Sequence, residues 1–320
     1  MTLSWFSIFR LGLVQMALGS IVVLTTSTLN RLMVVEGGLP AVIPGLLVSF
    51  HYGVQITRPA WGFFSDTGNN RTKWIIIGII VLALGGILAT LGVITIDSNF
   101  VLGLMLSILA YGFIGLGVGC SGTSLLAFLA IATRPDRRAA AASLTWLMMI
   151  FGIAATAGIV GSLMEPYSQT RLIAIVSSVC AIASMLTIVA VMGIEKHYTG
   201  YDKRDDTQEQ SIIRGLKEIW TEPKARVFTI FVALSMTAYF MQELILEPYA
   251  GLVFNFSPGE TTSLSGIQNM GVFFGMLSVG ISVSGFKLGS LKMWVCFGCM
   301  GSALSLIAIS LFAYSNFAIP

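Results

Sequence analysis

The chain has 320 residues, of which 55% are hydrophobic and only 10% charged, and its formal net charge is +3. A soluble domain carries about 25% charged residues, so this composition excludes an ordinary water-soluble protein and favours one dissolved in a bilayer. The 34 glycines agree with this, because helices that pack within lipid favour small residues at their contacts. We therefore predict an all-α polytopic membrane protein.

Nine apolar windows are long enough to span a bilayer, which takes about 20 residues of helix. Helix is the expected state of each window, because unpaired backbone groups are not tolerated in lipid. The windows are residues 10–30, 40–61, 74–96, 100–131, 141–163, 171–194, 226–248, 262–285 and 290–314.

A polar stretch divides these windows into six and three. We predict an N-terminal six-helix bundle (1–194), a cytoplasmic linker (195–225) and a partial C-terminal bundle of three helices (226–320). Within the linker, five apolar residues share one helical face, which predicts an amphipathic helix on the inner membrane surface; they are Ile212, Ile213, Leu216, Ile219 and Trp220. Docking of that helix against the underside of the protein would give the same pattern.

The basic residues predict the orientation. With a cytoplasmic N-terminus, all but two of the 18 Lys and Arg residues lie on the inner side, and the two exceptions are Arg31 and Arg171. Cytoplasmic loops of membrane proteins carry this excess of positive charge. We therefore expect an integral membrane protein with its N-terminus in the cytoplasm.

The loop after the second window reads GFFSDTGNNRTK and contains Gly62, Asp66, Gly68 and Arg71. It resembles the loop motif of the major facilitator superfamily, in which glycine permits close approach of helix ends and the acid can cap a helix N-terminus. A solvated turn with ordinary inner charges is the alternative. The resemblance implies a plan of two six-helix halves with the last three helices missing, so we expect a truncated or fragmentary member, or else a shorter protein.

Acidic residues interrupt the seventh window. Glu243 and Glu247 are four residues apart and share a helix face, and Pro248 follows, where it would end or bend the helix. Because carboxylates facing lipid cost several kcal/mol, we expect them to face the bundle interior or the outer water. A functional polar site and a helix–helix anchor involving Arg31 or Arg171 are both open.

A histidine, His51, lies near the middle of the second window with Gln55 on the same face. Such an imidazole can hydrogen-bond a neighbouring helix, relay a proton or ligate a metal. The four cysteines lie in apolar runs, where we expect them to be small core residues. No catalytic triad, phosphate loop, paired metal ligands or nucleic-acid surface is evident, so we expect neither an enzyme nor a metal site.

Three stretches carry a closer resemblance: TLNRLMVVEGGLPAVIPGLL (28–47), LAIATRPDRRAAAASLTWLMMIFG (129–152) and FMQELILEPYAGLVFNFSPGETTSL (240–264). They resemble the PucC/LhaA family, a major-facilitator branch tied to light-harvesting complexes. The resemblance implies light-harvesting complex assembly or (bacterio)chlorophyll delivery in a photosynthetic or thylakoid membrane, with light-harvesting polypeptides and pigment-synthesis enzymes as partners. The family signature covers Gln242, Glu243, Glu247, Pro248 and Tyr249.

Three hypotheses follow for the function. In the first, the protein binds (bacterio)chlorophyll, and His51 is an axial ligand of the chlorophyll magnesium. In the second, it is a secondary transporter of a small solute, proton-coupled through Glu243 or Glu247; the absence of a buried arginine in the fourth window and of a Gly-Pro pair in the fifth weakens this. In the third, it is a scaffold that binds no small molecule.

Overall fold

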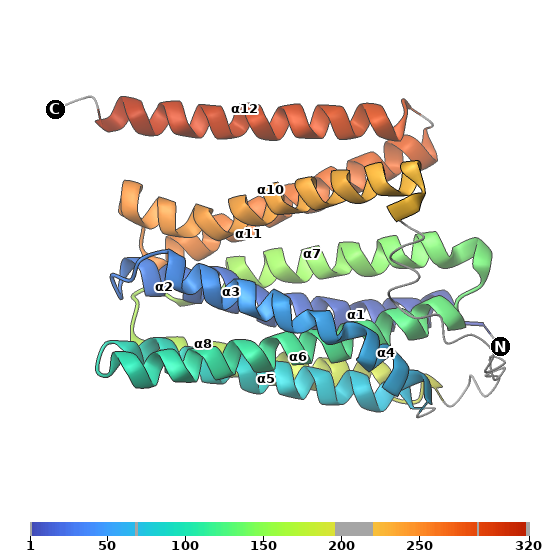
Figure 1. Ribbon diagram of the computed structural model, residues 1–320, viewed down its shortest axis with the longest axis horizontal. Coiled ribbons are helices and arrows are strands. Elements are labelled where there is room, and N and C mark those ends of the chain that lie inside the picture. The colour runs from blue at the N-terminus through green and yellow to red at the C-terminus, as the bar shows by residue number, and fades with distance from the viewer. Residues whose placement is uncertain (1, 68–69, 196–219, 287, 318–320) are drawn as a thin grey trace.

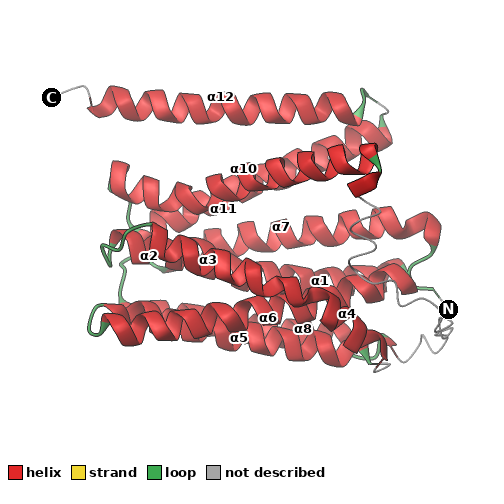
Figure 2. Ribbon diagram, viewed as in Figure 1, coloured by secondary structure: helices red, strands yellow, loops and turns green. Residues whose placement is uncertain are grey.

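The computed structural model describes residues 2–67, 70–195, 220–286 and 288–317, and helices account for nearly all of them (Figure 2). The predicted all-α class is confirmed. Most of the predicted amphipathic helix lies outside the described residues, as does Gly68. Trp220, the last residue of that predicted face, is described and exposed.

The first half of the chain forms a bundle (Figure 1). Its first span is α1 (Trp5–Val23), a π-helical turn η1 (Leu24–Thr28) and α2 (Leu29–Val35), and its second is α3 (Val42–Val54), a 3-10 turn η2 (Gln55–Thr57) and α4 (Arg58–Thr67). There follow α5 (Arg71–Ile96), α6 (Phe100–Ala132), η3 (Pro135–Arg137), α7 (Arg138–Leu163) and α8 (Gln169–Val191). The second half holds α10 (Pro223–Phe254), α11 (Pro258–Gly280), η5 (Ile281–Gly285) and α12 (Leu291–Phe317).

Eight helical segments of the described chain are long and apolar enough to cross a membrane, and they coincide with eight of the nine predicted windows. The other window, 40–61, is helical as α3, η2 and the start of α4 but is not among the eight. His51, Gln55 and Arg58 lower its hydropathy, and the 3-10 turn interrupts it. This segment is therefore less apolar than the eight, and its helix is interrupted.

Successive spans run in opposite directions, so that alternate connections lie at the same end of the bundle (Figure 1). The start of α1 and the end of α12 lie at opposite ends. This arrangement agrees with the order of loops that the charge pattern predicts, whereas the side that faces the cytoplasm stays a prediction.

The apolar core lies in the first half of the chain. Its main cluster joins residues of α1, η1, α2, α3, α5, α6, α7 and α8, whereas among the described residues after 220 the buried apolar side chains are those of Pro248, Ala250 and Pro258. Cys120 and Cys180 are buried as predicted, but Cys296 and Cys299 on α12 are exposed, so the prediction of a core position was wrong for these two. The reason is that α12 lies at the edge of the bundle, with most of its described side chains exposed.

The two halves meet mainly where α7 packs against α11. A Cβ atom added to Gly161 would lie 2.6 Å from the backbone nitrogen of Ser263, and one added to Gly266 would lie 2.7 Å from that of Gly158. Such close backbone approach requires residues without side chains, as in other membrane helix pairs. This contact fixes the position of α10 and α11 against the first span, where the polar residues gather.

Candidate functional site

A buried polar junction joins the first span to α10 and α11, and it is centred on the π-helical turn η1. All five η1 residues are buried. The hydroxyls of Thr25 and Thr26 donate to the Val22 carbonyl at 2.9 Å, and the Tyr111 hydroxyl donates to the Thr25 carbonyl at 2.6 Å. Single π turns within helices occur frequently at functional sites, and here the turn brings hydroxyl groups to the boundary between the halves.

Glu247 lies in this junction. It is 1% exposed, and the Ser27 hydroxyl donates to its Oε1 atom at 2.6 Å. The hydroxyls of Thr28 and Thr262 are 3.2 Å apart across the same boundary and form a second polar contact there. Glu247 thus faces the bundle interior, which was one of the two expected orientations. It bonds Ser27, while the expected partner Arg31 forms its ion pair with Glu36.

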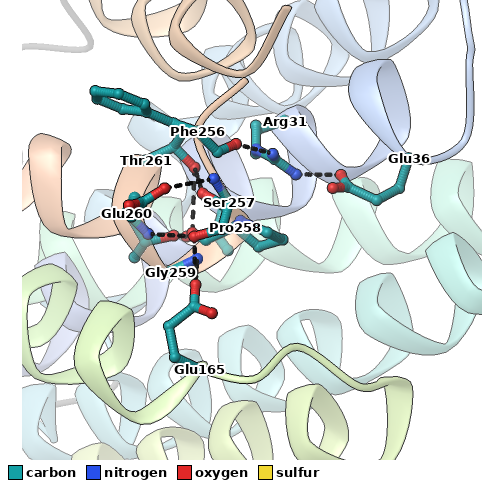
Figure 3. Close-up of polar contacts among 11 residues, drawn as sticks. Arg31, Glu36, Glu165, Phe256, Ser257, Pro258, Gly259, Glu260 and Thr261 are labelled. Atoms are coloured by element: carbon teal, nitrogen blue, oxygen red, sulfur yellow. Dashed lines mark hydrogen bonds and ion pairs between the residues drawn. The ribbon is translucent and has the colours of Figure 1, made fainter. Parts of the chain in front are cut away.

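The guanidinium of Arg31 also crosses between the halves. Arg31 is 1% exposed, and its Nη2 atom donates to the Phe256 carbonyl at 2.6 Å (Figure 3). Its ion pair with Glu36 holds the guanidinium in this position. Arg171 is the other arginine that the charge pattern places on the outer side. It donates to the Pro166 carbonyl at 2.9 Å, so it stabilises the loop between α7 and α8 that precedes it.

The start of α11 is bound to the first half by Glu165. Its Oε1 atom accepts hydrogen bonds from the Ser257 hydroxyl and, at 3.1 Å, from the Gly259 amide (Figure 3). Ser257 and Glu260 form a capping box at the same helix start. Glu165 therefore adds a negative charge at a helix N-terminus, where it is stabilising.

A cavity of about 340 Å³ lies between η1, α3 and α10. Its walls are largely apolar, and its titratable lining residues are Glu243 and Tyr52. The ring centroids of Tyr52 and Phe240 are 5.1 Å apart. The two acids of α10 thus have different surroundings, since Glu243 lines this cavity and Glu247 lies in the junction.

His51 is buried beside the cavity but does not line it. Its Nε2 atom lies 2.9 Å from the Gln55 amide nitrogen, and the Gln55 amide oxygen accepts from Arg58. An amide that accepts through oxygen donates through nitrogen, so Nε2 is the acceptor and Nδ1 carries the proton. Nδ1 has no hydrogen-bond partner among the described residues. The imidazole is therefore engaged within its own helix, which does not favour a ligand role.

The remaining signature residues are not brought into the cavity. Gln242 is half-buried on α10 and is not a lining residue, and the Tyr249 ring packs edge-on against Phe254 at 5.9 Å. The helix continues through Pro248 to Phe254, so the proline does not end it. Among the described residues, no group of three or more His, Cys, Asp or Glu side chains is placed to hold a metal ion.

The facilitator-like loop motif begins in α4, which contains Gly62 and Asp66, and ends at Arg71, the first residue of α5. Glu195 caps α5, because it accepts from the backbone nitrogen of Arg71 at 2.8 Å and from that of the next residue at 3.0 Å. The sequence did not single out Glu195, since it lies far along the chain from the helix that it caps.

Sequence reasoning also missed Ser27, Thr28, Tyr52 and Glu165. A signal existed for the first two, because the run LTTST places four hydroxyl residues in succession within an apolar window. Tyr52 follows the histidine that was singled out, but nothing in the sequence shows which of the two lines a cavity. Glu165 lies in a connection and reads as an ordinary loop acid.

The family model described as PUCC protein matches residues 28–319. The Bacteriochlorophyll synthase 44.5 kDa chain of Rhodobacter capsulatus is 61% identical over 309 residues, covering 97% of this chain and 72% of that protein. Protein PucC of Cereibacter sphaeroides is 29% identical over 295 residues, covering 88% and 63% of the two chains. Protein PucC of Rhodobacter capsulatus is 25% identical over 283 residues, covering 84% and 61%.

The chain therefore spans less than two thirds of the length of the two PucC proteins and 72% of the synthase chain. The match extends through both halves of the bundle and includes the polar junction and the cavity, apart from residues 24–27 of η1. The apolar helices make it an integral membrane protein. The resemblance seen in the three sequence stretches is confirmed, and the chain belongs to the PUCC protein family.

Proposed function

We propose that this chain is a non-enzymatic membrane protein that aids assembly of light-harvesting complexes by binding or delivering (bacterio)chlorophyll. The names of its relatives support a role in making photosynthetic pigment or complexes, since one is called a bacteriochlorophyll synthase chain and others are called PucC. The structural observation that carries the proposal is the cavity between η1, α3 and α10.

The chemical character of the residues that line the cavity suits such a pigment. A bound pigment of this type supplies a flat apolar ring system and a magnesium ion that accepts an axial ligand. Phe240 and Tyr52 offer aromatic surface, Met236 and Met241 offer adaptable apolar contact, and Glu243 offers a carboxylate. The volume is at the small end of the range for ligand pockets, about 300–1,000 Å³, so the cavity would hold part of the pigment.

The name of the 61% identical relative raises the question of catalysis. The described lining residues include one carboxylate and one phenol, but no serine–histidine or cysteine–histidine pair that could form a nucleophile with its base. We therefore propose that the chain holds the pigment and that partner enzymes carry out the chemistry on it. Light-harvesting polypeptides would be the other partners, in a photosynthetic membrane with the N-terminus in the cytoplasm.

A secondary transporter is the second candidate, and the position of Glu243 favours it over a scaffold without ligand. A carboxylate in a cavity can carry a proton together with a small solute. The two proposals differ in the ligand that they require, since one needs a bound tetrapyrrole and the other needs uptake driven by a pH gradient.

The test is the absorption spectrum of the full chain purified from a pigment-producing host. We expect bound pigment, and we expect Met241→Trp, which fills the cavity, to remove most of it. The matched control is Ile245→Trp, one turn further along α10 on an exposed position outside the cavity, which should retain the pigment. If the wild-type protein were colourless and vesicles containing it accumulated a solute under a pH gradient, the proposal would be refuted in favour of transport.

A further inference from the structure

The geometry points to Glu243, rather than His51, as the side chain that ligates the magnesium of a tetrapyrrole held between η1, α3 and α10. This inference rests on the proposed function and adds to it the identity of the coordinating group. It contradicts the expectation drawn from the sequence, which chose the imidazole because it lies in mid-membrane.

The first argument is the separation of the two acids. Glu247 is committed to the junction, where Ser27 donates to it at 2.6 Å. Glu243, one turn earlier on the same helix, is directed to the cavity and lines it together with Tyr52 and Phe240. Only one of the two carboxylates is therefore placed where a ligand could reach it.

The second argument concerns His51. Its side chain is 1% exposed, and its basic nitrogen accepts the hydrogen bond from Gln55. Coordination through Nε2 would break that bond, and the His51 ring is also in edge-on contact with the ring of Tyr52, whose centroid lies 4.6 Å away. Coordination through Nδ1 would require the other tautomer and an open path to a buried atom.

The third argument is chemical. Magnesium is a hard cation that prefers oxygen ligands, and carboxylates are its usual protein ligands. An ionised carboxylate in largely apolar surroundings is costly unless it binds a proton or pairs with a positively charged group or a Lewis acid, and the lining residues of this cavity include no lysine, arginine or histidine. The magnesium of such a pigment, whose charge the ring nitrogens already balance, would act as a Lewis acid toward the Glu243 carboxylate.

The experiment compares a magnesium chlorophyll with its metal-free pheophytin counterpart. Each is titrated into the detergent-purified full chain, and binding is followed by quenching of pigment fluorescence and by the absorption bands that respond to axial coordination. The variants are Glu243→Gln, Glu243→His and His51→Gln, with Gln242→Leu as the matched control on the same helix outside the cavity.

We expect Glu243→Gln to weaken binding of the magnesium pigment at least 10-fold while leaving the metal-free pigment unchanged. Glu243→His should restore tight binding with a shifted coordination band, and it keeps the test valid if the glutamine variant fails to fold. His51→Gln and Gln242→Leu should bind as the wild type does. If Glu243→Gln bound the magnesium pigment as tightly as the wild type does, or if it lost affinity for both pigments equally, Glu243 would not be the magnesium ligand. Either result would still agree with the proposal that the wild-type protein binds pigment. A wild-type protein that binds neither pigment would instead overturn the proposed function.

Discussion

Replacing Gly161 with alanine tests how closely the two halves of the bundle are packed. The added methyl group would lie 2.6 Å from the Ser263 backbone nitrogen and 2.7 Å from the Gly259 carbonyl oxygen, so the backbones of α7 and α11 must separate. Gly158, one turn earlier on α7, is the matched control, because a Cβ atom there has no neighbour within 4 Å.

The comparison isolates the contact between the helices. Each substitution gains about 0.8–1.0 kcal/mol of helix propensity, and this gain cancels between the two variants. Forcing extra volume into a packed contact costs about 1–3 kcal/mol. We therefore expect Gly161→Ala to be less stable than Gly158→Ala by about 1–3 kcal/mol.

Both free energies can be measured by titrating the purified protein with a denaturing detergent and following loss of helical circular dichroism. Gly158→Ala should be as stable as the wild type or up to about 1 kcal/mol more stable. Equal stability of the two variants would mean that α7 and α11 are not in backbone contact at Gly161, and the relation proposed between the halves would be wrong.

Three further predictions concern the junction and the topology. Ser27→Ala should lower the free energy of unfolding by about 1–3 kcal/mol, because it removes the hydroxyl that donates to the buried Glu247 carboxylate at 2.6 Å; a denaturant titration that showed no loss would exclude this contact. Glu165→Ala should speed hydrogen exchange in the first turn of α11 and lower the free energy of unfolding by about 0.5–1.5 kcal/mol, because it removes the acceptor of the Gly259 amide. Unchanged exchange in that turn would contradict the capping role of Glu165. In a cysteine-free background, cysteines at positions Arg137 and Gln169 should be labelled from opposite sides of the membrane, the first from the cytoplasm, and labelling from one side would refute the topology.

The helical architecture could be predicted because lipid imposes a single requirement on every span, which is that each backbone group must be paired within its own helix. Eight windows of apolar sequence therefore coincide with long helices. The second window was harder to judge, because His51, Gln55 and Arg58 reduce its apolarity and their hydrogen bonds follow one face of the helix. Its helix forms with an interruption at η2 that the sequence did not indicate.

The contents of the site depended on contacts between residues far apart in the chain. Glu165 reaches the start of α11, and Ser27 reaches α10, over separations of 92 and 220 residues. Neither pairing leaves a local pattern, since a capping acid normally lies within the turn that it caps and a serine in an apolar helix normally bonds its own backbone. The π turn that directs Ser27 outward from α1 has no reliable sequence signal.

The separation of Glu243 and Glu247 shows what helix spacing can and cannot establish. Residues four apart share a face, but they are also about 6 Å apart along the helix axis. Over that distance, the element that packs against the helix can differ from one residue to the other. On α10 the neighbour at Glu243 is α3, with the cavity between them, whereas at Glu247 it is η1, with a serine hydroxyl in contact. One acid can then hold the halves together while the other stays available to a ligand. A substitution at Glu247 should consequently act on stability, and one at Glu243 on ligand binding, although the two residues look equivalent in the sequence.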